Sequence, residues 1–236
     1  MRSKMLRLIA YTALACVSSY AMAEAEGDQS GSADAVANVA LANQLAAYGK
    51  ANKDPIALIS AARILKGSGI QDTARAKNSE VSDPKKEAKA HVAAAPTAAK
   101  PKSNADAVKD FLDQARTFAN GTPEIVALAD MTGKMLGTRG AFGGPKRTVD
   151  TVLSGHRDVY RIAFRGHESA AIALRTDDSS DVSIAVYDGD GDRICSGEVQ
   201  TGHVALCKWR PRTASTYTIS ITNNGDEDSD YALVTN

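Results

Sequence analysis

The spacing of apolar residues changes once along this chain of 236 residues, and that change constrains the fold more than any other feature. Between residues 33 and 136, outside one interruption, apolar side chains recur three or four positions apart, as on one face of a helix. From residue 148 to 236 they instead alternate with polar or small residues, as in strands with one buried face. Amphipathic helices, and strands with one apolar face, must both pack this apolar side against another element. We therefore predict an α+β chain in which N-terminal helical hairpins precede a C-terminal antiparallel β-sandwich spanning residues 147–236.

The helical part consists of two similar hairpins. Asp54 precedes Pro55 and Thr122 precedes Pro123, and each pair places a capping residue before a proline at the first helical position. Both junctions share the order Ala-Asn-x-x-Pro, which indicates a faint internal repeat. We predict that the two hairpins bury their stripes on each other as a four-helix bundle within residues 33–136. An array of peptide-binding helical repeats is the alternative, although the aromatic pattern of such repeats is missing.

The helical pattern is interrupted between residues 68 and 103. This stretch has no apolar periodicity and is rich in Ala, Lys and Pro. Such a composition cannot build a core, so we predict that 68–103 is a disordered linker. Its lysines would also suit an anionic partner.

The first 23 residues have the pattern of an export signal. A basic start precedes a mostly apolar stretch at 8–20, and small residues surround the expected cleavage site after Ala23. An uncleaved anchor helix and lipid attachment at Cys16 are the alternatives. Elsewhere the apolar runs are shorter than a membrane-spanning helix needs. We therefore expect a periplasmic or secreted protein whose mature form does not span a membrane.

Two cysteines remain after the signal, Cys195 and Cys207, and an exported protein meets an oxidising environment. We predict a disulfide between them, worth about 3 kcal/mol. A metal or redox pair is the alternative, but the spacing fits neither C-x-x-C nor a zinc site. If Ile194, Val204 and Leu206 point inward, both cysteines lie on the outer face, and their strands should be neighbours in one sheet.

Three blocks of the C-terminal part carry a family resemblance. They are DVYRIAF at 158–164, DVSIAVYD at 181–188, and ASTYTISI at 214–221 followed by DYAL at 230–233. In order and spacing they resemble the bacterial pre-peptidase C-terminal domain. The resemblance implies a β-sandwich that accompanies secreted proteases as a non-catalytic accessory. Because no peptidase domain precedes it here, it implies no protease activity for this chain.

An acidic cluster is the candidate for a cofactor site. Asp188, Asp190 and Asp192 stand at alternate positions and could meet a calcium ion outside the cell. The glycines between them equally favour a tight hairpin turn. An EF-hand loop is excluded because Val199 stands where its final Glu belongs.

Other apparent motifs lack a required residue. The pair His167-Glu168 begins like a zinc protease helix, but Ala171 replaces the second His. The glycine-rich stretch before Thr148 is broken by Pro145, so we interpret it as a hinge between domains and not as a phosphate loop. Trp209, flanked by cations, suits either a ligand platform or core packing. None of the histidines has the sequence context of a general base; they are His91, His156, His167 and His203.

Charge and motifs together limit the function. The 28 basic residues balance the 28 acidic ones, which gives no electrostatic reason to expect nucleic-acid binding. We expect an exported, non-enzymatic protein that binds a protein or cell-envelope component, without a cofactor unless calcium fills the acidic cluster. The alternatives are an accessory subunit of a secreted peptidase and an unrecognised hydrolase.

Overall fold

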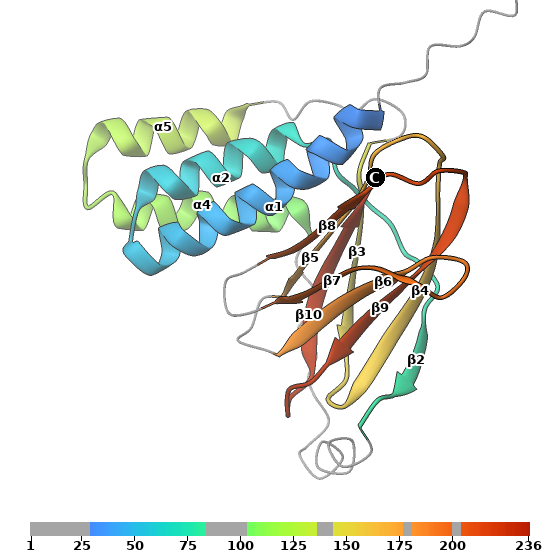
Figure 1. Ribbon diagram of the computed structural model, residues 1–236. Helices are drawn as coiled ribbons and strands as arrows, with labels where there is room; N and C mark the ends of the chain where they lie inside the picture. The colour runs from blue at the N-terminus through green and yellow to red at the C-terminus, as the bar shows by residue number, and fades with distance from the viewer. Residues whose placement is uncertain (1–28, 84–102, 136–143, 177–180, 200–203) are drawn as a thin grey trace, which may run out of the picture.

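The computed structural model places a layer of helices against one outer face of a β-sandwich (Figure 1). It describes residues 29–83, 103–135, 144–176, 181–199 and 204–236. The predicted α+β class is confirmed at this level. The predicted signal segment 1–23, with its cleavage site at Ala23, lies outside the described residues.

The described helices form two hairpins. The predicted capping residues Asp54 and Thr122 both stand directly before a helix, but the side chain of Thr122 makes no capping hydrogen bond. Asp54 accepts hydrogen bonds from the backbone N–H groups of Ile56 and Ala57, at 2.9 and 3.1 Å. Lys53 and Gly121 occupy corresponding positions of the two junctions, and both have positive φ, 53° and 81°. The helices are α1 (Gln29–Asn52), α2 (Pro55–Gly67), α4 (Asn104–Phe118) and α5 (Pro123–Lys134).

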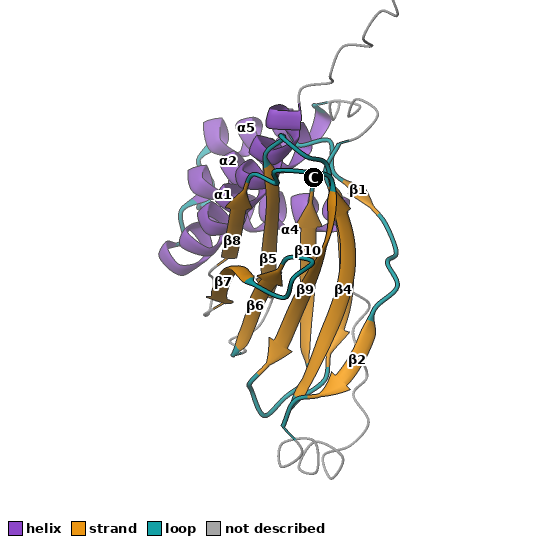
Figure 2. Ribbon diagram, turned by 45° about the vertical axis from the view of Figure 1, so that its right-hand side comes forward, coloured by secondary structure: helices purple, strands orange, loops and turns teal. Residues whose placement is uncertain are grey.

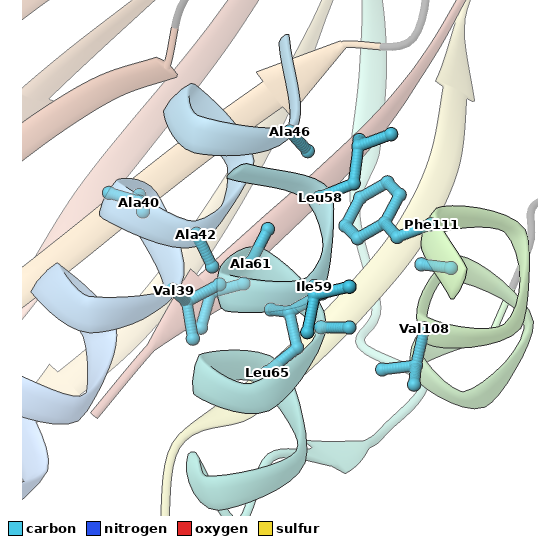
Figure 3. Close-up of a cluster of buried hydrophobic side chains, with 14 of the residues drawn as sticks. Val39, Ala40, Ala42, Ala46, Leu58, Ile59, Ala61, Leu65, Val108 and Phe111 are labelled. Atoms are coloured by element: carbon cyan, nitrogen blue, oxygen red, sulfur yellow. The ribbon is translucent and has the colours of Figure 1, made fainter. Parts of the chain in front are cut away.

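Helix α2 lies between α1 and α4, and its buried side chains Leu58, Ile59 and Leu65 face both neighbours (Figure 3). Helix α1 packs its other side on strands β5, β8 and β10, so that Ala173 and Val234 join the helical core. The predicted four-helix bundle is therefore not confirmed. The apolar stripes are buried partly on the sheet, because strand β5 is apolar on both faces.

Ten strands of the described residues form two sheets, which lie face to face (Figure 2). Sheet A has the order β1-β3-β10-β5-β8, and sheet B has the order β2-β4-β9-β6-β7. All neighbours pair antiparallel except β1 and β3. The strands are β1 (Gln71–Asp72), β2 (Asn78–Val81), β3 (Lys146–Val152), β4 (His156–Phe164), β5 (Ala170–Thr176), β6 (Val182–Tyr187), β7 (Arg193–Val199), β8 (Val204–Trp209), β9 (Ser215–Asn223) and β10 (Ser229–Thr235).

The start of the predicted linker 68–103 belongs to the sandwich, which corrects our prediction of disorder for residues 71–81. Strand β1 pairs with β3 and strand β2 pairs with β4, so the crossing segment 73–77 passes from sheet A to sheet B. Main-chain ladders hold this polar stretch, and such ladders need no apolar periodicity. Lys146 to Thr148, which we interpreted as part of a hinge, open strand β3. Residues 84–102 lie outside the described part.

A polar network anchors the crossing segment. The Nζ of Lys77 lies 2.7 Å from Oδ2 of Asp158 and 2.8 Å from Oδ1 of Asp150. Asp158 is 1% exposed and also accepts hydrogen bonds from the hydroxyls of Ser79 and Tyr231. The carboxylate is thus buried with three donors around it, which is what a buried charge requires.

The structure contains the predicted disulfide, but between different strands from those we expected. Cys195 lies on β7 and Cys207 on β8, the outer strands of sheets B and A, with their Cα atoms 6.0 Å apart. The prediction that both strands are neighbours in one sheet is wrong. Its premise also fails, because Ile194 and Leu206 are exposed while Cys207 is buried. The disulfide therefore links the two sheets along one side of the sandwich.

Candidate functional site

A cavity lies in the helical layer, between α2, α4, the end of α5 and strand β1. We call it the helix cavity. Its volume is about 680 Å³, and its lining exposes more apolar than polar surface. The apolar wall consists of Leu65, Ile70, Val108 and Leu112. A cavity of this size matches the range in which proteins enclose small ligands.

One side of the helix cavity is formed by the C-terminal end of α2 and the residues that follow it. The hydroxyl of Ser68 donates to the carbonyl of Leu65 at 2.6 Å, which caps the last turn. Gly69 then adopts φ of 62°, a left-handed conformation that favours glycine, and the chain turns toward β1. Ile70 packs against the helical core on the way. Residues directly after α2 therefore form one side of the cavity.

The opposite sides come from the second hairpin. Helix α4 begins with a capping box in which Ser103 and Asp106 exchange hydrogen bonds, and this fixes its first turn at the cavity. Gly133 of α5 leaves space there. A Cβ at this position would lie 3.6 Å from Cδ1 of Leu112 and 3.9 Å from Nη2 of Arg116. Glycine thus keeps the side of the cavity next to α4 open.

Five charged side chains line the helix cavity. Asp113 lies 2.6 Å from Nζ of Lys109 and 2.7 Å from Nη1 of Arg116. The hydrogen bond between Asp113 and Lys109 raises the pKa of Lys109 and lowers that of Asp113. Asp72 pairs with Arg147 on strand β3 at 3.3 Å.

The fifth charge, Lys66, is bound differently. Its Nζ donates to the carbonyls of Thr132 and Gly133, at 3.1 and 2.7 Å. These carbonyls belong to the last turn of α5, where the helix dipole favours a cation. Among the described residues, Lys66 forms no ion pair with a carboxylate. It therefore contributes an unmatched positive charge beside an apolar wall.

Only indirect signals of this cavity are visible in the sequence. Val108 and Leu112 belong to the predicted helical stripe, which indicates burial but does not separate a core from a ligand wall. Lys66 and Gly133 carry no motif. The cavity arises from the placement of two hairpins and a sheet edge that lie far apart in the sequence.

The acidic cluster at 188–192 forms a tight turn, which is one of the two structures predicted for it. Oδ1 of Asp188 accepts hydrogen bonds from the backbone N–H groups of Asp190 and Asp192, at 3.0 and 2.9 Å. Gly191 has φ of 89°, as the turn requires. No group of three or more potential metal-ligating side chains occurs in the part of the chain that the structure describes. Calcium binding stays a prediction.

The other residues singled out from the sequence lie apart from the helix cavity. Trp209 packs against Phe164 and Tyr217, with ring centroids 4.9 and 5.2 Å away, at the edge of the sandwich core. His167 has φ of 64° in the loop after β4, where its backbone N–H donates to Pro211. His156 opens strand β4. His91 and His203 lie outside the described residues.

Comparisons with known proteins give distant likenesses. No family model matches the chain, and no curated protein matches it. Similar solved structures include the pre-peptidase C-terminal domain of a collagenase from Bacillus anthracis, with 15% identity over 38% of this chain and 87% of that one, and a TM-score of 0.33. The C-terminal CBM6 of the laminarinase LamC from Zobellia galactanivorans shows 10% identity over 37% of this chain and 88% of that one, with a TM-score of 0.24. These values are too low to place the chain in a family. None of the described helices is long and apolar enough to cross a membrane.

Proposed function

We propose that this chain is an exported, non-enzymatic binding protein whose helix cavity takes up a small, largely apolar molecule. The observation that carries the proposal is the cavity itself. About 680 Å³ of space, open to solvent on one side, is lined by side chains from three helices and a strand, and apolar surface dominates its lining. A preformed, mostly apolar cavity with a few convergent polar groups is the usual form of a small-ligand site.

The surrounding structure supports this role because it holds the cavity in shape. Helix α2, which supplies Leu65, packs on both α1 and α4. Helix α1 is in turn buried on sheet A. The sandwich thus serves as a support for the helical layer, and a preformed site loses little conformational entropy when it binds.

A binding experiment with a neutral apolar dye tests the proposal. The fluorescence of N-phenyl-1-naphthylamine should rise on addition of the protein and saturate at one dye per chain. In the Gly133→Leu variant the new side chain extends toward Leu112, so dye affinity should fall about tenfold or more, as expected when a filled volume displaces an apolar ligand. Gly133→Ala is the matched control, because its Cβ would make only ordinary contact at 3.6 Å and should leave affinity within about threefold.

A second blocking variant guards against an effect of folding. Ala105 lines the cavity from the exposed first turn of α4, so Ala105→Leu should weaken dye binding from the opposite side. Circular dichroism should show unchanged helix content in all three variants. Absence of dye binding to the native protein would refute the proposal. It would also be refuted if Gly133→Leu and Ala105→Leu both bound the dye with the affinity of the native protein.

Export is tested separately, on the mature N-terminus. If the signal is cleaved after Ala23, mass spectrometry of the protein recovered from the periplasm or medium should find a chain that begins at Glu24. A lipid on Cys16 or an intact Met1 would contradict this part of the proposal.

A further inference from the structure

We propose that the ligand of the helix cavity is an anionic amphiphile with a single negative charge, such as a long-chain carboxylate, whose head group binds Lys66. This inference rests on the proposed function and names the class of its ligand.

The charges of the lining leave one positive charge over. The lining contains three positively charged side chains, Lys66, Lys109 and Arg116. It contains two negatively charged ones, Asp72 and Asp113, so its net charge is +1. Outside the lining, Arg147 pairs with Asp72, Asp130 pairs with Arg116, and Asp110 acts on Lys109. One added negative charge would therefore balance the charged side chains of the lining itself.

The unmatched charge belongs to Lys66. Asp113 and Asp130 balance Lys109 and Arg116, at distances from 2.6 to 2.9 Å. An ammonium group has three N–H donors, and the two carbonyls of α5 account for two of those of Lys66. The third donor remains for a ligand oxygen, because no other acceptor for Lys66 occurs among the described residues.

The position of Lys66 defines a head and a tail. It directly follows Leu65, which is 3% exposed and part of the apolar wall together with Val108 and Leu112. A ligand that reaches both groups must have an ionised end next to an apolar body.

The amount of charge favours a carboxylate over a phosphate monoester. A phosphate monoester carries close to two negative charges at neutral pH. The extra positive charge of the lining balances only one of these two negative charges. The second negative charge would lie near Asp72 and Asp113 and be repelled by their carboxylates. A monocarboxylate leaves no net charge in the lining.

Displacement of the neutral dye by three decyl compounds tests the charge of the head group. Decanoate, 1-decanol and decyltrimethylammonium share a tail and differ in charge. Decanoate should displace the dye at about tenfold lower concentration than 1-decanol, as expected for one charge-assisted hydrogen bond in a partly exposed site. Decyltrimethylammonium should be the weakest competitor, because its charge adds to the surplus.

Variants of the lysines locate the effect. Lys66→Gln keeps a donor for the carbonyls of α5 but removes the charge, so the preference for decanoate over 1-decanol should fall to within about threefold. Lys66→Arg should keep the preference. Lys208→Gln is the matched control, because it also removes one positive charge but lies on strand β8, outside the lining of the helix cavity.

If Lys66→Gln folds poorly, a variant that removes a negative charge from the lining tests the same proposal. Asp113→Asn removes a half-exposed negative charge from the lining and should increase the preference for decanoate. Equal displacement by decanoate and 1-decanol would overturn the anionic ligand while leaving the proposed function intact. Absence of dye binding to the native protein would instead overturn the proposed function, and this inference with it.

Discussion

Lys77 and Asp158 join the two sheets on one side of the sandwich, at 2.7 Å between Nζ and Oδ2. Lys77 ends the crossing segment that leaves β1 of sheet A, and Asp158 lies on β4 of sheet B. On the opposite side, Cys195 and Cys207 connect the other two outer strands, β7 and β8. Both sides of the sandwich are therefore closed by the chain, one by a main-chain crossing and the other by a covalent bond.

Removal of the lysine should be costly because it leaves a buried carboxylate unpaired. Asp158 is 1% exposed, so Lys77→Met should lower the free energy of unfolding by about 3 kcal/mol. Urea unfolding followed by circular dichroism measures this change. The control is Lys109→Met, which breaks an ion pair on the exposed face of α4 and should have little effect. Equal stability of the two variants would show that the ion pair of Lys77 does not hold the sheets together.

The two tyrosines beside Asp158 should make the fold sensitive to alkaline pH. The hydroxyl of Tyr231 donates to Asp158 at 2.8 Å, and the hydroxyl of Tyr160 lies 2.5 Å from that of Tyr231. Burial raises the pKa of both tyrosines, and the neighbouring carboxylate of Asp158 raises them further. Above about pH 10 the unfolded chain releases these protons while the folded chain retains them. Stability is therefore complete below pH 10 and falls as the pH rises above it.

Absorbance at 295 nm as a function of pH measures this directly. Tyr160 and Tyr231 should remain protonated in the folded protein and titrate only as it unfolds. Free tyrosine titrated in the same buffer provides the comparison. If all tyrosines of the folded protein titrated together near pH 10, the buried network would be disproved.

The disulfide should stabilise the sandwich by restricting the unfolded chain. Cys195 and Cys207 are separated by 12 residues, and a loop of this length corresponds to about 3 kcal/mol. Addition of a reductant should lower the melting temperature of the native protein. The Cys195→Ala/Cys207→Ala variant should melt at the lower temperature with or without reductant. Free thiols in denatured, unreduced protein from the exported compartment would contradict the disulfide.

The sequence predicted most strands and the cysteine pair, but the faces of β7 and β8 were assigned incorrectly. Ile194 and Leu206 were expected to point into the core because they are apolar, yet they are 40% and 41% exposed. Ala205 and Cys207 fill the core instead. Alternation identifies two faces of a strand, but it cannot decide which is buried when both carry apolar side chains, as they do in β8.

The crossing segment and the helix cavity could not be predicted, for a different reason. Residues 71–81 are polar and contribute backbone ladders and the side chain of Lys77, none of which leaves a periodic apolar signal. The cavity depends on how Leu65, Leu112 and Gly133 meet from three helices. Local patterns predict each helix, while the space between helices is decided by tertiary packing.

Close backbone packing at the loop after β4 provides a last test of the sandwich. A Cβ on Gly166 would lie 2.7 Å from backbone atoms of Thr213 and Ala214, nearer than side chains approach in folded proteins. Backbone cannot move aside as a flexible side chain can, so Gly166→Ala should lower the free energy of unfolding by about 1–3 kcal/mol. Gly189→Ala is the matched control, because a Cβ there would meet nothing within 4 Å. Urea unfolding of both variants measures this difference in stability. If the free energy of unfolding falls with urea concentration at the same slope in both variants, the difference comes from packing in the folded state. If Gly166→Ala were as stable as the control, this loop would not pack closely against residues 213–214.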